Sequence, residues 1–243
     1  MDKFILLNVG AEKAGTTWFY EYIKSRSDFL DIGKELNAIQ STPLLPVRYD
    51  NRYQDNLDFY FDKIVSSLIM SDKKFTGDFT HYEGSTPNLF HILKDGFENR
   101  NISVIPVYII RDPIQRSWSA YKMLNHGSDF NPSMSRIQLW LLQEFLACKY
   151  VETIKALDKV FDRVYYIFYE ELFRDSDNIM KWLCNSLNIK FEPTNSSNKV
   201  NASRFFDPVP QEFINLIGLS KRNKLAYEYL GDRFQVLPKE YYI

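Results

Sequence analysis

Short apolar runs alternate along this chain with longer stretches in which apolar residues recur every three or four positions. A short run rich in β-branched and aromatic residues is typical of a strand, and the longer spacing is typical of an amphipathic helix. The expected strands are Phe4–Val9, Lys74–Asp78, Ser103–Ile110 and Val164–Phe168. The expected helices are Thr16–Arg26, Leu57–Met70, Pro87–Phe97, Pro113–Leu124, Ser135–Leu157, Asp177–Leu187 and a final helix after Pro210.

The alternation of strands and helices predicts an α/β fold with three layers. A mostly parallel central sheet is flanked by helices, and a P-loop-like strand-loop-helix unit stands at the N-terminus. In such sheets ligands bind beyond the carboxyl ends of the strands. We expect one domain over residues 1–243, a length that suits a single large α/β domain. Asp31–Tyr53 and Phe191–Pro210 match neither pattern, and long connections of this kind are usually functional loops.

Charge and composition restrict the partners. The chain has 30 basic and 31 acidic residues and a pI of about 6.3, so no overall field attracts nucleic acid or an anionic membrane. No apolar stretch approaches the roughly 18 residues of a membrane span. We therefore expect a cytoplasmic protein with no nucleic-acid partner and no membrane span. Cys148 and Cys184 lie in helix-like surroundings and are expected to be buried thiols; nothing indicates the oligomeric state.

The segment NVGAEKAGTTW, residues 8 to 18, is close to a phosphate-binding loop. Gly10 and Gly15 permit close approach of an anion to the backbone, and the amides of a helix that begins at Thr16 point positive charge at the same place. In an ATP- or GTP-binding loop a lysine follows the second glycine. Here that position is Thr16, and Lys13 lies inside the loop. The alternative interpretation is a tight strand-to-helix turn with a hydroxyl cap.

A second segment, VYIIRDPIQRSWSAY at residues 107 to 121, points to the same chemistry. The apolar strand ends at Arg111, and Pro113 begins a helix that carries Ser119. An arginine at the carboxyl end of a strand can direct two hydrogen bonds onto a phosphate, and the serine could contact the same oxygens. The alternative is that Arg111 and Asp112 pair with each other and cap the helix.

Together the two segments make the chain resemble the sulfotransferases that use 3′-phosphoadenosine 5′-phosphosulfate (PAPS). The family's R-D-P-x-x-R-x-x-S-x-Y signature matches the run from Arg111 to Tyr121 without a gap. The resemblance implies that Arg111 and Ser119 bind the 3′-phosphate and that the loop binds the 5′-phosphosulfate, leaving 3′-phosphoadenosine 5′-phosphate (PAP) as product. The loop signature matches Lys13, Ala14, Gly15, Thr16, Thr17 and Trp18.

Weaker matches extend the resemblance over most of the chain. They are GKELN at 33–37, GDFTHY at 77–82, YYIFYEELFRD at 165–175 and NKVNASRFF at 198–206. The last is similar to a loop that closes over the nucleotide, which implies cofactor contacts from Lys199, Asn201 and Arg204. Residues 37–40 lack an expected aromatic pair, and Phe79 and His81 replace a lysine and a proline. The acceptor therefore stays open between a carbohydrate, a small lipid-like alcohol, a phenol and a protein tyrosine.

Sulfuryl transfer is an in-line displacement at sulfur, and it needs a base for the acceptor proton and positive charge for the transferring group. Lys13 and the loop amides suit the second role without a metal. Glu35, next to Lys34, is the first candidate base by resemblance to carbohydrate-type members. His81 is the rival, because a neutral imidazole suits proton removal. The plain alternatives are an exposed loop glutamate and a hydrogen-bonded, partly buried histidine.

Two other classes of protein are weighed against this one. A kinase on the same loop would need a lysine after Gly15, which is absent, and an acidic magnesium ligand, which Asp78 could supply. A nucleotide-binding protein without turnover stays open because the acceptor segments are altered.

Three tryptophans at helical spacing, Trp118, Trp140 and Trp182, are expected in the core. Trp18 is expected either beside the nucleotide or as an anchor of its helix. Asp112 is expected to brace Arg111. Arg116 is expected on a helix surface or on the phosphate.

Overall fold

A parallel sheet forms the centre of the molecule. The computed structural model describes residues 3–36, 51–125, 148–193, 208–217 and 220–233. Within these, β1 (Phe4–Gly10), β2 (Phe75–Asp78), β3 (Ser103–Ile110) and β4 (Tyr165–Phe168) pair in the order β2-β1-β3-β4, all parallel. The predicted strands are confirmed within one residue at each end, and so is the predicted α/β class.

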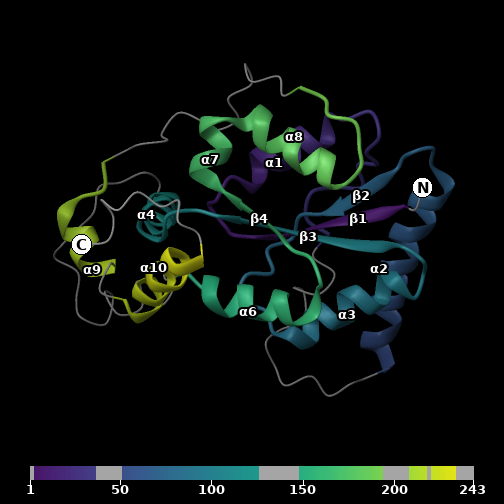
Figure 1. Cartoon of the computed structure of the whole chain (residues 1–243). Helices are drawn as coiled ribbons and strands as arrows, with labels where there is room; N and C mark the ends of the chain where they lie inside the picture. The colour runs from purple at the N-terminus through teal and green to yellow at the C-terminus, as the bar shows by residue number, and fades with distance from the viewer. Residues whose placement is uncertain (1–2, 37–50, 126–147, 194–207, 218–219, 234–243) are drawn as a thin grey trace.

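Helices cover both faces of the sheet (Figure 1). On one face lie α1, α7 and α8, on the other α2, α3 and α6, while α4, α9 and α10 stand beyond the carboxyl ends of the strands. The bounds are α1 (Thr16–Lys24), α2 (Asn51–Met70), α3 (Pro87–Glu98), α4 (Pro113–Leu124), α6 (Tyr150–Val160), α7 (Tyr169–Arg174), α8 (Ser176–Ser186), α9 (Gln211–Ile217) and α10 (Lys221–Arg233).

The helices differ from the expected ones at four places. Helix α2 begins at Asn51, ahead of the expected Leu57. The short helix α7 follows β4 directly and was not predicted, because its 6 residues are too few to display a helical period. Two helices rather than one follow Pro210. Of the long helix expected over Ser135–Leu157, the first part lies outside the described residues, and α6 continues to Val160.

The central strand explains why the N-terminal run is apolar at nearly every position. Every residue of β1 is buried, since β1 lies between two other strands and is covered by helices on both faces. Phe4 stacks on Phe75 of β2 with ring centroids 4.8 Å apart, and Phe29 packs against Phe75 at 5.2 Å. This core leaves the loop after β1 at the carboxyl edge of the sheet, where the second segment also arrives at the end of β3.

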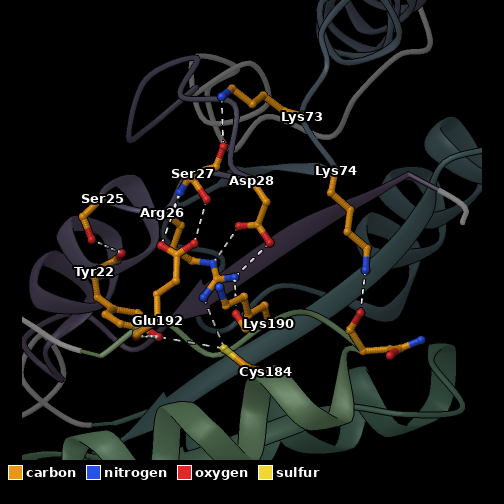
Figure 2. Close-up of polar contacts among 11 residues, drawn as sticks. Tyr22, Ser25, Arg26, Ser27, Asp28, Lys73, Lys74, Cys184, Lys190 and Glu192 are labelled. Carbon is orange, nitrogen blue, oxygen red and sulfur yellow. Dashed lines mark hydrogen bonds and ion pairs between the residues drawn. The ribbon is translucent and has the colours of Figure 1, made fainter.

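The far end of α1 is fixed to the segment after α8 (Figure 2). Arg26 is buried and donates hydrogen bonds of 2.9 Å to both carboxylate oxygens of Asp28, one of 2.8 Å to the carbonyl of Lys190 and one of 3.4 Å to Cys184 Sγ. Tyr22 donates to the carbonyl of Glu192 at 2.8 Å. The helix that begins at the loop is thus anchored where it ends.

The side-chain expectations for cysteine and tryptophan have mixed outcomes. Cys148 and Cys184 are buried and form no disulfide, as predicted. Trp118 is buried, but the core assignment of Trp182 is wrong, because 46% of it is exposed. Its ring lies edge-on to Tyr165 at 5.8 Å on the outer side of α8. Trp140 lies outside the described residues.

Candidate functional site

The loop after β1 turns sharply at a glycine that admits no side chain. Gly15 has a φ of 87° and directly precedes the first turn of α1. A Cβ atom there would lie 3.0 Å from the ring of Phe173 and 3.1 Å from that of Tyr169. Glycine is therefore required both by the left-handed backbone and by the two aromatic rings. No side chain caps α1, and Thr16 and Thr17 of its first turn line the cavity described below, so the helix N-terminus is available to an anion there.

Arg111 reaches this loop from the end of β3. Its guanidinium donates a hydrogen bond of 2.9 Å to the carbonyl of Lys13 and lies 4.3 Å from the centre of the Tyr169 ring. The backbone of Arg111 is held as well, because the Tyr150 hydroxyl donates to its carbonyl at 2.8 Å. Arginine stacked on an aromatic ring in this way keeps its plane and its remaining donors in a fixed direction.

Arg111 differs from the other buried arginines in its charge balance. Arg26, Arg111 and Arg116 are 3%, 7% and 7% exposed. Arg26 pairs with Asp28 at 2.9 Å, and Arg116 pairs with Glu83 at 2.7 Å. Among the residues that the structure describes, no carboxylate lies within ion-pair distance of Arg111, and its buried Nε makes no hydrogen bond. A buried cation without a counter-charge is costly, so this position suits an anionic ligand.

A cavity of about 280 Å³ brings the two segments together. Arg111 and Ser119 line it from the second segment, and the predicted residues Lys13, Gly15, Thr16, Thr17 and Trp18 line it from the first. Trp18 stacks on Tyr22 at 5.9 Å and meets Phe173 edge-on at 5.5 Å, so it anchors α1 and borders the cavity at once. Ala14 is fully buried and does not line the cavity. Lys199, Asn201 and Arg204 lie outside the described residues.

Lys13 is half-buried inside the cavity. Burial lowers its pKa below the ordinary value for lysine; Glu12 opposes this shift, while Arg111 and Lys34 add to it. Its ammonium lies 3.4 Å from Met123 Sδ in α4. Lys13, Lys34 and Arg111 thus place like charges beside the cavity, and an anionic ligand would reduce their mutual repulsion.

The two candidate bases lie side by side. Glu35 Oε1 is 3.8 Å from His81 Nε2 and 3.3 Å from Lys34 Nζ. Lys34 also donates to the Thr17 hydroxyl at 3.1 Å, which ties this group to the start of α1. Both His81 and Lys34 line the cavity. Burial lowers the pKa of His81, and Glu35 partly opposes the shift, so the imidazole is kept neutral and able to accept a proton.

Several cavity residues were not identified from the sequence. Glu12, Met123, Tyr169 and Phe173 also line it, as does Lys34, which the sequence indicated only as the neighbour of Glu35. A signal existed for Tyr169, because it comes directly after β4 at the carboxyl edge of the sheet, where ligands of α/β folds bind. Met123 and Phe173 carry no comparable sequence signal.

Arg116 and Asp112 take structural positions. Arg116 lies neither on a helix surface nor in the cavity lining. It pairs with Glu83 and donates a hydrogen bond of 3.1 Å to the carbonyl of Glu12, which stabilises the loop. Asp112 caps α4 by accepting from the Gln115 amide at 2.8 Å, instead of pairing with Arg111.

The structure argues against the magnesium role considered for Asp78. Its buried carboxylate accepts hydrogen bonds from the hydroxyls of Tyr60, Tyr82 and Thr80 at 2.6, 2.7 and 2.6 Å, and from the Thr80 amide at 2.9 Å. Nor does it line the cavity. Within the described ranges, no cluster of three or more histidine, cysteine, aspartate or glutamate side chains could hold a metal ion, and no helix there combines the length and apolarity of a membrane span.

Comparisons with known proteins agree on the fold. A crystal structure of a sulfotransferase from Alicyclobacillus acidocaldarius superposes with a TM-score of 0.64 at 16% identity and covers all of both chains. The sulfotransferase domain of the Synechococcus PCC 7002 olefin synthase has a TM-score of 0.53 at 12% identity, over 89% of this chain and 94% of that one. No curated protein matches in sequence. The model of the sulfotransferase domain matches residues 3–208, and the chain therefore belongs to the sulfotransferase family.

Proposed function

We propose that this protein transfers a sulfuryl group from PAPS to a hydroxyl or amine of an acceptor. Membership of the sulfotransferase family supports the reaction class. The observation that carries the choice of donor is Arg111, a buried guanidinium that faces the cavity with no carboxylate partner among the described residues. A 3′-phosphate would supply the missing negative charge, with Ser119 as a second donor.

The rest of the donor would occupy the remainder of the cavity. The N-terminal amides of α1, with Thr16 and Thr17, would bind the 5′-phosphosulfate. Trp18, Tyr169 and Phe173 would offer ring faces or edges to the adenine. No metal is part of the proposal, because Lys13 and the helix N-terminus supply the positive charge.

The chemical step is an in-line displacement at sulfur. The acceptor oxygen or nitrogen forms a bond to sulfur while the bond from sulfur to the phosphate oxygen breaks, and PAP leaves with the bonding electron pair. Lys13, protonated, stabilises the charge that grows on that phosphate oxygen. The proton of the acceptor passes to Glu35 or His81, of which we favour Glu35. The distance of 3.8 Å between Glu35 and His81 allows both to face one acceptor group.

The acceptor is proposed to be a small molecule or a carbohydrate. A nucleotide-binding protein of the same fold without turnover is the second candidate, favoured by the replacement of a family lysine and proline by Phe79 and His81. Conversion of PAPS to PAP in the presence of a panel of sugars, aliphatic alcohols and phenols separates the two. Binding of PAP without conversion for any acceptor would favour the second.

Isothermal titration with PAP tests the donor. We expect micromolar binding that Arg111→Ala abolishes and that ATP with magnesium does not displace. Lys155→Ala, a change on α6 outside the cavity lining, is the control and should bind PAP as the wild type does. Absence of PAP binding, or preference for ATP, would contradict the proposal.

A further inference from the structure

Two helices beyond the matched sulfotransferase domain pack against the helix that carries Ser119. The match ends at residue 208, whereas α9 and α10 cover residues 211–217 and 221–233 and stand beside α4 (Figure 1). Phe213 of α9 meets the rings of Trp118 and Tyr121 edge-on, at 5.0 and 5.6 Å. These three residues form the centre of a second small core, separate from that of the sheet.

A polar contact from the same helices reaches the Arg-Asp-Pro turn. The Tyr227 hydroxyl of α10 donates a hydrogen bond of 2.8 Å to Asp112 Oδ2. The other carboxylate oxygen of Asp112 accepts from the Gln115 amide and caps α4. The backbone amide of Asp112 donates a hydrogen bond of 2.9 Å to Glu170 Oε1 of α7. Asp112, which follows Arg111 in sequence, is therefore held by contacts with α4, α7 and α10.

We propose that Tyr227 is a positioning residue for the 3′-phosphate subsite. It fixes the Asp112 carboxylate and thereby the turn from which the Arg111 guanidinium projects into the cavity. This inference rests on the proposed function, because it assigns the ligand of Arg111 to a phosphate. It adds a role for α10, which lies outside the matched domain.

The chemistry of the pair supports this role. Burial and the neighbouring Asp112 raise the pKa of Tyr227 far above its ordinary value, so its hydroxyl stays a donor at neutral pH. Asp112 is itself buried and would lose one of its donors if the hydroxyl were removed. A buried carboxylate with an unsatisfied oxygen favours a rearranged turn, and a displacement of well under an ångström at Arg111 weakens a bidentate contact.

The test compares Tyr227→Phe with Tyr166→Phe by isothermal titration. Tyr166 also donates its hydroxyl to an aspartate, Asp158, but it does not line the cavity. We expect Tyr227→Phe to weaken PAP binding about five- to tenfold, and to leave the affinity for adenosine 5′-phosphate, which lacks the 3′-phosphate, within twofold. Tyr166→Phe should change neither affinity.

A double-mutant cycle with Asp112→Asn provides a second measurement. If Tyr227 acts through Asp112, Tyr227→Phe should weaken PAP binding less in the Asp112→Asn background than in the wild type. Equal losses for PAP and adenosine 5′-phosphate, or wild-type PAP affinity in Tyr227→Phe, would overturn the positioning role alone. Failure of the wild-type protein to bind PAP would overturn the proposed function and this role together.

Discussion

The guanidinium of Arg111 donates a hydrogen bond of 2.9 Å to the backbone carbonyl of Lys13, and so joins the end of β3 to the loop after β1. This contact joins the loop signature and the Arg-Asp-Pro signature at one cavity. The neighbouring Arg116 makes a parallel contact of 3.1 Å to the carbonyl of Glu12. The two arginines hold consecutive carbonyls of the loop, but among the described residues only Arg116 of the two has a carboxylate partner, Glu83. The division suggests that one arginine supports the loop and the other binds the ligand.

This division predicts different effects of the two arginines on stability. Arg116→Met leaves Glu83 buried without its partner and should lower the free energy of unfolding by about 3–5 kcal/mol. Arg111→Met removes a buried charge that has no carboxylate partner among the described residues, and should change stability by less than about 1 kcal/mol or raise it. Urea denaturation without nucleotide measures both. Equal destabilisation by the two changes would show that Arg111 is a structural residue.

The hydrophobic pattern predicted the sheet well, because the strands of a covered parallel sheet are buried over most of their length. The bounds of β1 and β3 follow directly from their apolar residues. Trp182 shows the limit of the same reasoning. It stands beside the buried Leu183 and Cys184 in sequence, yet its own side of α8 faces solvent. Only the packing of the helix decides which of two adjacent apolar positions is covered.

The site was predictable where its residues are contiguous in sequence. Lys13 to Trp18 and Arg111 to Ser119 each form one short run after a predicted strand, and the family resemblance assigned both runs to one ligand. Tyr169 and Phe173 line the cavity from α7, and Tyr227 of α10 contacts Asp112 beside Arg111, so these contacts depend on how α7 and α10 pack. The pairing of Arg116 with Glu83 is likewise a contact between distant segments that no local pattern records.

The pKa of His81 should report its surroundings directly. Burial lowers it from the ordinary value of 6.5, and Glu35 opposes that shift. We expect the His81 ring to titrate below pH 6.5 and, in Glu35→Gln, at a still lower pH, because the carboxylate that favours the charged imidazolium is gone. NMR titration of ring protons, assigned with His81→Asn, measures both. An upward shift in Glu35→Gln would contradict the arrangement.

The lowered pKa of Lys13 predicts weaker donor binding at alkaline pH. Lys13 loses its charge as pH rises through a pKa below the ordinary 10.5, and the attraction for the 5′-phosphate disappears with it. PAP affinity should therefore begin to fall at a pH below the 10.5 that is ordinary for lysine. Lys13→Arg keeps the charge and should flatten this fall in titrations at each pH. The same fall in both proteins would exclude Lys13 as its source.

Glu35 is predicted to act in the chemical step and not in donor binding. Its side chain borders His81 and Lys34 without lining the cavity itself. Glu35→Gln keeps the shape and removes the proton acceptor, so kcat should fall about 100-fold or more, while the Kd for PAP stays within twofold. Turnover is measured as conversion of PAPS to PAP with an acceptor found by screening, and Glu21→Gln, an exposed glutamate of α1, is the matched control. Near-normal turnover in Glu35→Gln together with loss of turnover in His81→Asn would transfer the role of base to His81.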